Sequence, residues 1–142
     1  MTATPELTLE KTGYEDWTPE LHAELGTHTA NPRVGTRLLL ENARMRVWEI
    51  RLAPGERLAF HRHVLDYFWT CVSGGDAISR DGDGNTKGRR YGVGETLALS
   101  FGEGESMIHD LINAGNADIV FTTVEFLDSA NQPLPLPDSV RA

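Results

Sequence analysis

The sequence has one cysteine, no long apolar run and fewer basic than acidic residues, and each shortage excludes a class of protein. With Cys71 as the single cysteine, no disulfide can form within the chain. A helix that crosses a bilayer needs about 20 predominantly apolar residues, and no stretch approaches that length. The first residues, MTATPELTLEK, have neither the basic start nor the apolar stretch of a signal peptide. We therefore expect a cytoplasmic protein without a membrane partner.

The charge balance argues against a nucleic-acid partner. The chain has 13 Lys+Arg and 21 Asp+Glu, which give a formal net charge of −8. Proteins that bind phosphate backbones present a basic surface, and here Arg89 and Arg90 are the only adjoining pair. With 39% hydrophobic residues, 14 Gly and 7 Pro, the composition is typical of one turn-rich globular domain.

Residues 1–35 are expected to form an N-terminal extension with one short helix. Thr18 is a suitable N-cap, Pro19 suits the first helical position, and Gly26 is expected just beyond the last turn. The stretch that follows, THTANPRVG, has the composition of a loop.

From residue 36 the pattern changes to short strands separated by turns. Trp48, Ile50 and Leu52 alternate onto one face of such a strand. Many short strands in this arrangement predict an all-β sandwich or barrel over residues 36–127. Five aromatic residues are the predicted barrel core: Trp48, Phe60, Trp69, Phe121 and Phe126.

The two ends of the chain are expected to lie outside this core. Residues 128–142 carry three prolines at alternate positions and are predicted to form an extended surface tail. Neither this tail nor the segment around Leu7–Leu9 is expected to join the core of its own chain. We therefore expect at least one of them to pack on a second subunit, which gives a homodimer.

The stretch FHRHVLDYFW places His61 and His63 two residues apart in strand-forming sequence. Residues i and i+2 of a strand face the same way, so both imidazoles should point into one space. Neutral imidazole is a good ligand for Fe, Zn, Ni or Cu. His109, which begins HDLIN in a later strand, is the best candidate for a third ligand.

The spacing of these residues resembles the first motif of the cupin family. Gly55, five residues, His61-x-His63, three residues, Tyr67, six residues and Gly74 follow the pattern G-x5-H-x-H-x3-E-x6-G. The segment also resembles a subgroup of small cupins linked by name to β-alanine degradation, which share the pattern H-x-H-x2-D-Y.

A second, weaker match lies further along the chain. His109-x3-Asn113 follows the H-x3-N end of the second cupin motif. The segment before His109 is longer than the pattern allows, and Ser100 or Phe101 stands where proline is usual. The resemblance covers about residues 36–127.

The resemblance implies a small single-domain barrel of the double-stranded β-helix or jelly-roll type, often dimeric, with a metal ion inside. The histidine ligands of the family fall on His61, His63 and His109, while the position of its glutamate ligand holds Tyr67. Three outcomes stay open: a three-histidine site with open positions, a site that Tyr67 or Asp66 approaches, or no metal.

The period of a strand also assigns roles to the neighbours of the histidines. It places Tyr67 on the histidine face, as a catalytic residue that donates a hydrogen bond or acts as an acid, or as a core residue. Asp66 falls on the opposite face, where it either orients a ligand histidine or is an exposed strand carboxylate. Trp69 shares the histidine parity and either lines the pocket or fills the core.

These features predict a non-haem metal enzyme that holds one divalent ion (Fe, Zn, Ni or Mn) and acts on a small organic molecule. An oxidoreductase of the dioxygenase type is favoured, because three neutral histidines with open positions suit iron. One alternative is a lyase, isomerase or cyclase with Tyr67 as acid or base beside a Lewis-acid metal. A second alternative is a non-catalytic cupin that binds a small ligand.

Overall fold

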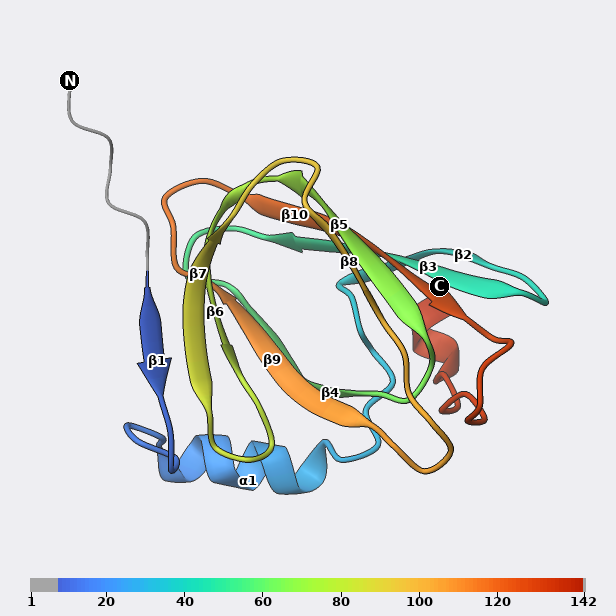
Figure 1. Cartoon of the computed structure of the whole chain (residues 1–142), viewed down its shortest axis with the longest axis horizontal. Helices are drawn as coiled ribbons and strands as arrows, with labels where there is room; N and C mark the ends of the chain where they lie inside the picture. Colours follow the sequence, from blue (N-terminus) through green and yellow to red (C-terminus); the bar gives the residue numbers. More distant parts are fainter. Residues whose placement is uncertain (1–7, 142) are drawn as a thin grey trace.

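The computed structural model describes residues 8–141, which fold into two antiparallel sheets that face each other (Figure 1). Sheet A has the strand order β1-β7-β6-β9-β4, and sheet B has the order β2-β3-β10-β5-β8. The strands of sheet A are β1 (Leu9–Lys11), β4 (Arg57–His63), β6 (Gly75–Arg80), β7 (Thr86–Tyr91) and β9 (Met107–Asn113). Those of sheet B are β2 (Arg37–Glu41), β3 (Met45–Leu52), β5 (Tyr67–Ser73), β8 (Thr96–Leu99) and β10 (Ile119–Phe126). The predicted all-β architecture is confirmed.

The core lies between the inner faces of the two sheets. Trp48, Ile50 and Leu52 of β3 are 0%, 8% and 2% exposed, as the alternation in the sequence predicts. They are joined from β10 by Phe121, which packs edge-on against Trp69 with ring centroids 5.4 Å apart. Apolar side chains from both sheets therefore fill the interior and stabilise the sandwich.

The prediction that Phe126 belongs to the core is wrong. Phe126 is 37% exposed, because an odd offset in sequence from the inward-facing Phe121 places it on the opposite face of β10. It lies on the outer face of sheet B, where its ring is 6.0 Å from that of Phe68.

The predicted short helix is present as α1 (Pro19–Thr27), at the bottom of Figure 1. Thr18 Oγ1 accepts a hydrogen bond from Leu21 N at 3.2 Å, so Thr18 is the N-cap. The helix ends later than expected, because Gly26 lies inside it and His28 is the C-cap. Among residues 8–141, no helix is both long and apolar enough to span a membrane.

Both ends of the described chain pack on their own subunit, and the C-terminal end joins its core, which corrects the expectation that the tail would lie outside it. In β1, Leu9 pairs with Gly88 of β7, so the N-terminal segment extends sheet A. At the other end, the 3-10 helix η1 (Asp138–Arg141) places Val140 against Trp48. Leu7 lies outside the described residues. The stated reason for a homodimer is thereby removed, and the dimer itself stays a prediction.

A buried carboxyl group lies in the inner face of sheet B. Glu125 of β10 is 3% exposed, and Trp48 Nε1 donates a hydrogen bond to its Oε1 at 2.8 Å. Burial raises the pKa of Glu125 to about 7, while the Trp48 hydrogen bond and the charge of Arg46 act in the opposite direction.

Glu125 gives the fold a pH dependence that a substitution can remove. Its pKa in the folded chain, about 7, is above the ordinary value of 4.5, so its stabilising contribution is complete below pH 4.5 and is lost as the pH rises through 7. Glu125→Gln keeps an uncharged acceptor for Trp48. We expect the free energy of unfolding of the variant, relative to wild type, to improve by about 2 kcal/mol between pH 5 and pH 8.

Urea denaturation at both pH values measures this difference. Glu10→Gln is the control, since Glu10 is an exposed carboxylate on β1. A difference between Glu125→Gln and wild type that does not change with pH would contradict the assignment.

Candidate metal centre

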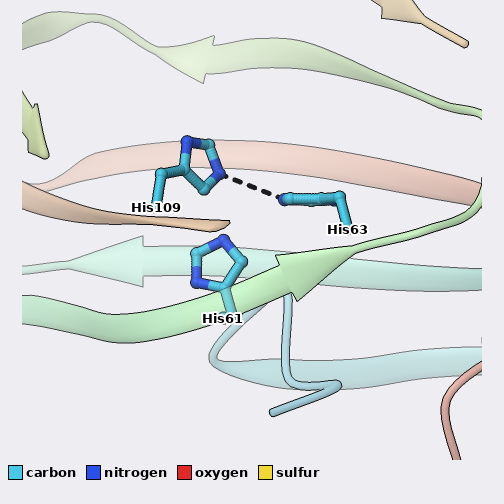
Figure 2. Close-up of side chains that lie close together, drawn as sticks. All are labelled: His61, His63 and His109. Atoms are coloured by element: carbon cyan, nitrogen blue, oxygen red, sulfur yellow. Dashed lines mark hydrogen bonds between the residues drawn. The ribbon is translucent and has the colours of Figure 1, made fainter. Parts of the chain in front are cut away.

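The three predicted histidines converge on one point inside the barrel (Figure 2). His61 and His63 lie on β4, and His109 lies on the neighbouring strand β9, directly opposite His61 in the register. Side chains of directly opposite residues share a face, so the imidazole of His109 joins the other two. One nitrogen of each ring lies within 4.8 Å of the corresponding nitrogens of the other two.

A β-bulge in β4 directs the histidines inward. The pairing of β4 with β9 shifts register between Leu58 and His61. Leu58 lines the interior cavity before the shift, and His61 and His63 line it after the shift. Phe60, between them, leaves the cavity and stacks on Trp17, with ring centroids 5.5 Å apart. Without the extra residue, strict alternation from Leu58 would direct Phe60 rather than His61 inward.

Tyr67 lies next to the histidines, but strand alternation does not explain this position. The chain leaves sheet A after His63 and enters sheet B at Tyr67, so alternation cannot be counted across residues 64–66. This short crossing folds the phenol ring back onto His63, with centroids 4.1 Å apart and planes 12° from parallel. Burial raises the pKa of Tyr67 above its ordinary value, with smaller contributions from Glu125 and Tyr91.

Among the described residues, Asp66 forms no hydrogen bond with a histidine, so its predicted role in orienting one has no support from its contacts. Its Oδ1 accepts a hydrogen bond from Phe101 N at 2.9 Å, which ties the crossing between the sheets to the segment after β8. The expectation of an exposed strand carboxylate is wrong, since Asp66 is half-buried and lies between strands. Trp69, in contrast, lines the same cavity as the histidines, because it lies two residues after Tyr67 on β5 and faces the same way.

The environment of the histidines favours their neutral form. Burial lowers the pKa of His61 to about 3 and that of His109 to about 4. Burial, together with the neighbouring His109 and His61, lowers the pKa of His63 well below its ordinary value. All three rings are therefore neutral near pH 7, which is the form that binds a metal ion.

The hydrogen bonds of the rings test whether the group fits a metal. His61 Nδ1 lies 2.8 Å from the carbonyl oxygen of Ala59, to which it donates, so Nε2 keeps a free lone pair. His63 Nε2 and His109 Nε2 face each other at 3.1 Å. Among the described residues, His63 Nδ1 is the buried side-chain nitrogen or oxygen that lacks a hydrogen-bond partner. One of these two Nε2 atoms donates to the other, so the cluster brings neutral, buried imidazole nitrogens together, the ligand type that fits a divalent transition metal.

A cavity of about 80 Å³ adjoins the three rings. Its other walls are largely apolar and include Leu58, Trp69, Leu111 and Phe121, with the phenol of Tyr67 among them. This volume holds a few water molecules or the end of a small organic molecule.

The sequence reasoning missed a buried ion-pair network behind the histidines. Asp110 is fully buried and points away from His109, its neighbour on β9. Its carboxylate accepts hydrogen bonds from Arg57 Nε at 2.8 Å, Arg80 N at 2.7 Å and Arg80 Nε at 3.0 Å. Arg57 also pairs with Glu24 of α1. A charged residue within the apolar strand MIHDLIN was the available signal, because such a residue needs a partner when buried.

Comparison with known proteins identifies the architecture. No family model and no curated protein matches the sequence. A cupin domain from Bordetella pertussis Tohama I is 25% identical with a TM-score of 0.56, over 63% of this chain and 88% of its own. A conserved protein with a double-stranded β-helix domain, from Klebsiella pneumoniae subsp. pneumoniae, is 22% identical with a TM-score of 0.53, over 82% of this chain and 95% of its own. The narrower resemblance to the H-x-H-x2-D-Y subgroup stays a prediction.

The Asp110 network should be essential to the stability of the histidine-bearing strands. Asp110→Asn keeps the shape of the side chain and removes the charge that two arginines share, so we expect the free energy of unfolding to fall by about 3 kcal/mol. Asp118→Asn is the control, because Asp118 is exposed and its contact with Arg51 is long, at 3.9 Å. Chemical denaturation measures both variants. A loss below 1 kcal/mol for Asp110→Asn would show that the network contributes little.

Proposed function

From its cupin fold, we propose that this chain is a metal-dependent enzyme that acts on a small organic molecule. His61, His63 and His109 hold one divalent ion. The observation that carries the proposal is the convergence of three buried, neutral imidazoles, with ligand nitrogens within 4.8 Å of one another, on the wall of an apolar cavity.

Non-haem oxygenase chemistry of the dioxygenase type is the reaction class that we favour, with iron as the ion. Among the described residues, the group that surrounds the candidate site consists of histidines alone, so no carboxylate fills a further coordination position. Neutral nitrogen ligands with open positions suit iron. Such an ion supplies Lewis acidity and redox chemistry with O2 when it is bound.

The side chains of the cavity have separate tasks in this proposal. Trp69 and Phe121 exclude bulk water from the reacting end of the substrate and strengthen polar interactions there. Tyr67, stacked on His63, limits the position of that ring and presents its phenol to the cavity. Ala59 fixes the tautomer of His61 through its carbonyl oxygen.

Metal analysis tests the site directly. We expect the His61→Ala/His63→Ala double variant to lose the bound divalent ion, because one remaining imidazole cannot hold it, while its far-UV circular dichroism stays that of a β protein. The measurement is elemental analysis of untagged protein. His22→Ala is the control, since His22 is exposed on α1, away from the cluster. Equal metal content in wild type and double variant would reject the site.

Tyr67→Phe separates the reaction classes, because it removes the hydroxyl and keeps the packing on His63. For an oxygenase, we expect weaker turnover, about 10-fold, with unchanged metal content and with O2 consumed in step with product. The position of Tyr67 beside the histidines also favours a second candidate, a lyase or cyclase with Tyr67 as acid or base. For that candidate, turnover would be lost and O2 would not be consumed. Unchanged kinetics would leave Tyr67 a packing residue.

A further inference from the structure

A surface groove continues outward from the histidine cavity. Its volume is about 560 Å³, and it lies over β6, β7 and the start of β9. Ser79, Tyr91 and His109 line both the groove and the inner cavity, so the two spaces share a wall. A molecule bound in the groove can therefore contact His109, one member of the histidine cluster.

Strand β7 contributes a row of cationic side chains to this groove. Lys87, Arg89 and Tyr91 alternate along the strand, face the same way and all line the groove. The guanidinium of Arg89 lies 3.9 Å from the ring centroid of Tyr91 and pairs with Glu95 at 2.6 Å. Arg89 is therefore held in place and its charge is balanced.

Lys87 differs from Arg89 in having no such partner. Among residues 8–141, no carboxylate forms an ion pair with its ammonium group, and Lys87 is exposed. The register places Lys87 directly opposite Ser79, whose Oγ lies 3.5 Å from His109 Nδ1. His109 lies opposite Asp81, two residues beyond Ser79 on the same side of β6, so roughly 12 Å separate the backbone at Lys87 from that at His109.

Among the described residues, no acidic side chain near the groove forms an ion pair with this lysine. Glu10 of β1 lies directly opposite Lys87 in the register, and Asp81 and Asp83 line the groove. Asp81 Oδ1 accepts hydrogen bonds from Asp83 N at 2.9 Å and Asn85 N at 3.0 Å, and its Oδ2 accepts one from Asn85 Nδ2 at 3.0 Å. Asp83 is exposed in the turn between β6 and β7. The groove is lined by three cations, Arg62, Lys87 and Arg89, and two carboxylates, Asp81 and Asp83, so it is more basic than a chain of net charge −8 and favours anions.

We propose that the groove binds the carboxylate of a small organic acid, with Lys87 as the cation that recognises it. The rest of the molecule extends past Ser79 and Tyr91 toward the histidine cavity, over the roughly 12 Å that separate Lys87 from His109. This inference rests on the proposed function, because it names the substrate class of the same site.

The chain offers a direct test, since it has two lysines, Lys11 and Lys87. Reductive methylation with 13C-formaldehyde keeps the charge and gives each lysine an NMR signal, which Lys11→Met and Lys87→Met assign. Acetate, malonate and succinate are titrated against their neutral amides. We expect at least one anion to shift the Lys87 signal without shifting that of Lys11, and the amides to shift neither.

Isothermal titration calorimetry with the best anion gives the second measurement. Lys87→Met keeps the aliphatic stem, removes the charge and should raise the Kd by roughly 10-fold. Lys87→Arg should restore most of the affinity. Lys11→Met should leave it unchanged, because Lys11 lies opposite Thr86, on the other face of sheet A from Lys87, and pairs with Asp16. Equal shifts of both lysines, no shift with any anion, or an unchanged Kd in Lys87→Met would overturn the proposal.

The test of the anion site does not depend on whether a metal ion is bound. Lys87 is not a ligand candidate, so its signal and the Kd are measured in metal-free and metal-loaded protein alike. A chain that binds the anion selectively and holds no metal would contradict the proposed function alone. A chain that holds the metal and shows no selective shift would contradict the anion site alone.

Discussion

The buried Asp110 carboxylate, with Arg57 and Arg80 around it, is the interaction on which the rest of the site depends. It joins β9 to β4 through Arg57 and to β6 through Arg80, on the face of β9 opposite His109. A fully buried charge is costly unless its partners are in place, so the three strands are held in one register. Glu24 extends the network to α1, which links the helix to the strand that carries His61 and His63.

Two irregularities in the chain, rather than its regular strands, place the side chains of the cavity. The bulge in β4 turns the histidines inward, and the crossing over residues 64–66 brings Tyr67 onto His63 from the opposite sheet. The site therefore has walls from both sheets. Apolar residues surround it, which keeps the imidazoles neutral, while the adjoining groove carries the unpaired charge of Lys87.

Much of the fold could be predicted because it follows from local patterns in the sequence. Thr18 caps α1 and the alternation of Trp48, Ile50 and Leu52 marks a strand with one buried face. Predictions failed for two different reasons. Phe121 and Phe126 fall on opposite faces of β10, so alternation alone excluded one of them from the core, and the packing of the sheets decided that it was Phe126. The hydrogen bond from Phe101 N to Asp66 joins residues distant in the chain, which no local pattern shows.

The sequence by itself determined that His61 and His63 share a face, because two residues of separation on a strand leave no other arrangement. The tertiary structure decided the third member, since His109 lies 46 residues from His63 and meets it only through the pairing of β4 with β9. It also decided that Asp110 is buried among arginines and that Lys87 borders the site. Such contacts result from the packing of whole strands, in which burial and charge are balanced over distant residues, and no short motif encodes that balance.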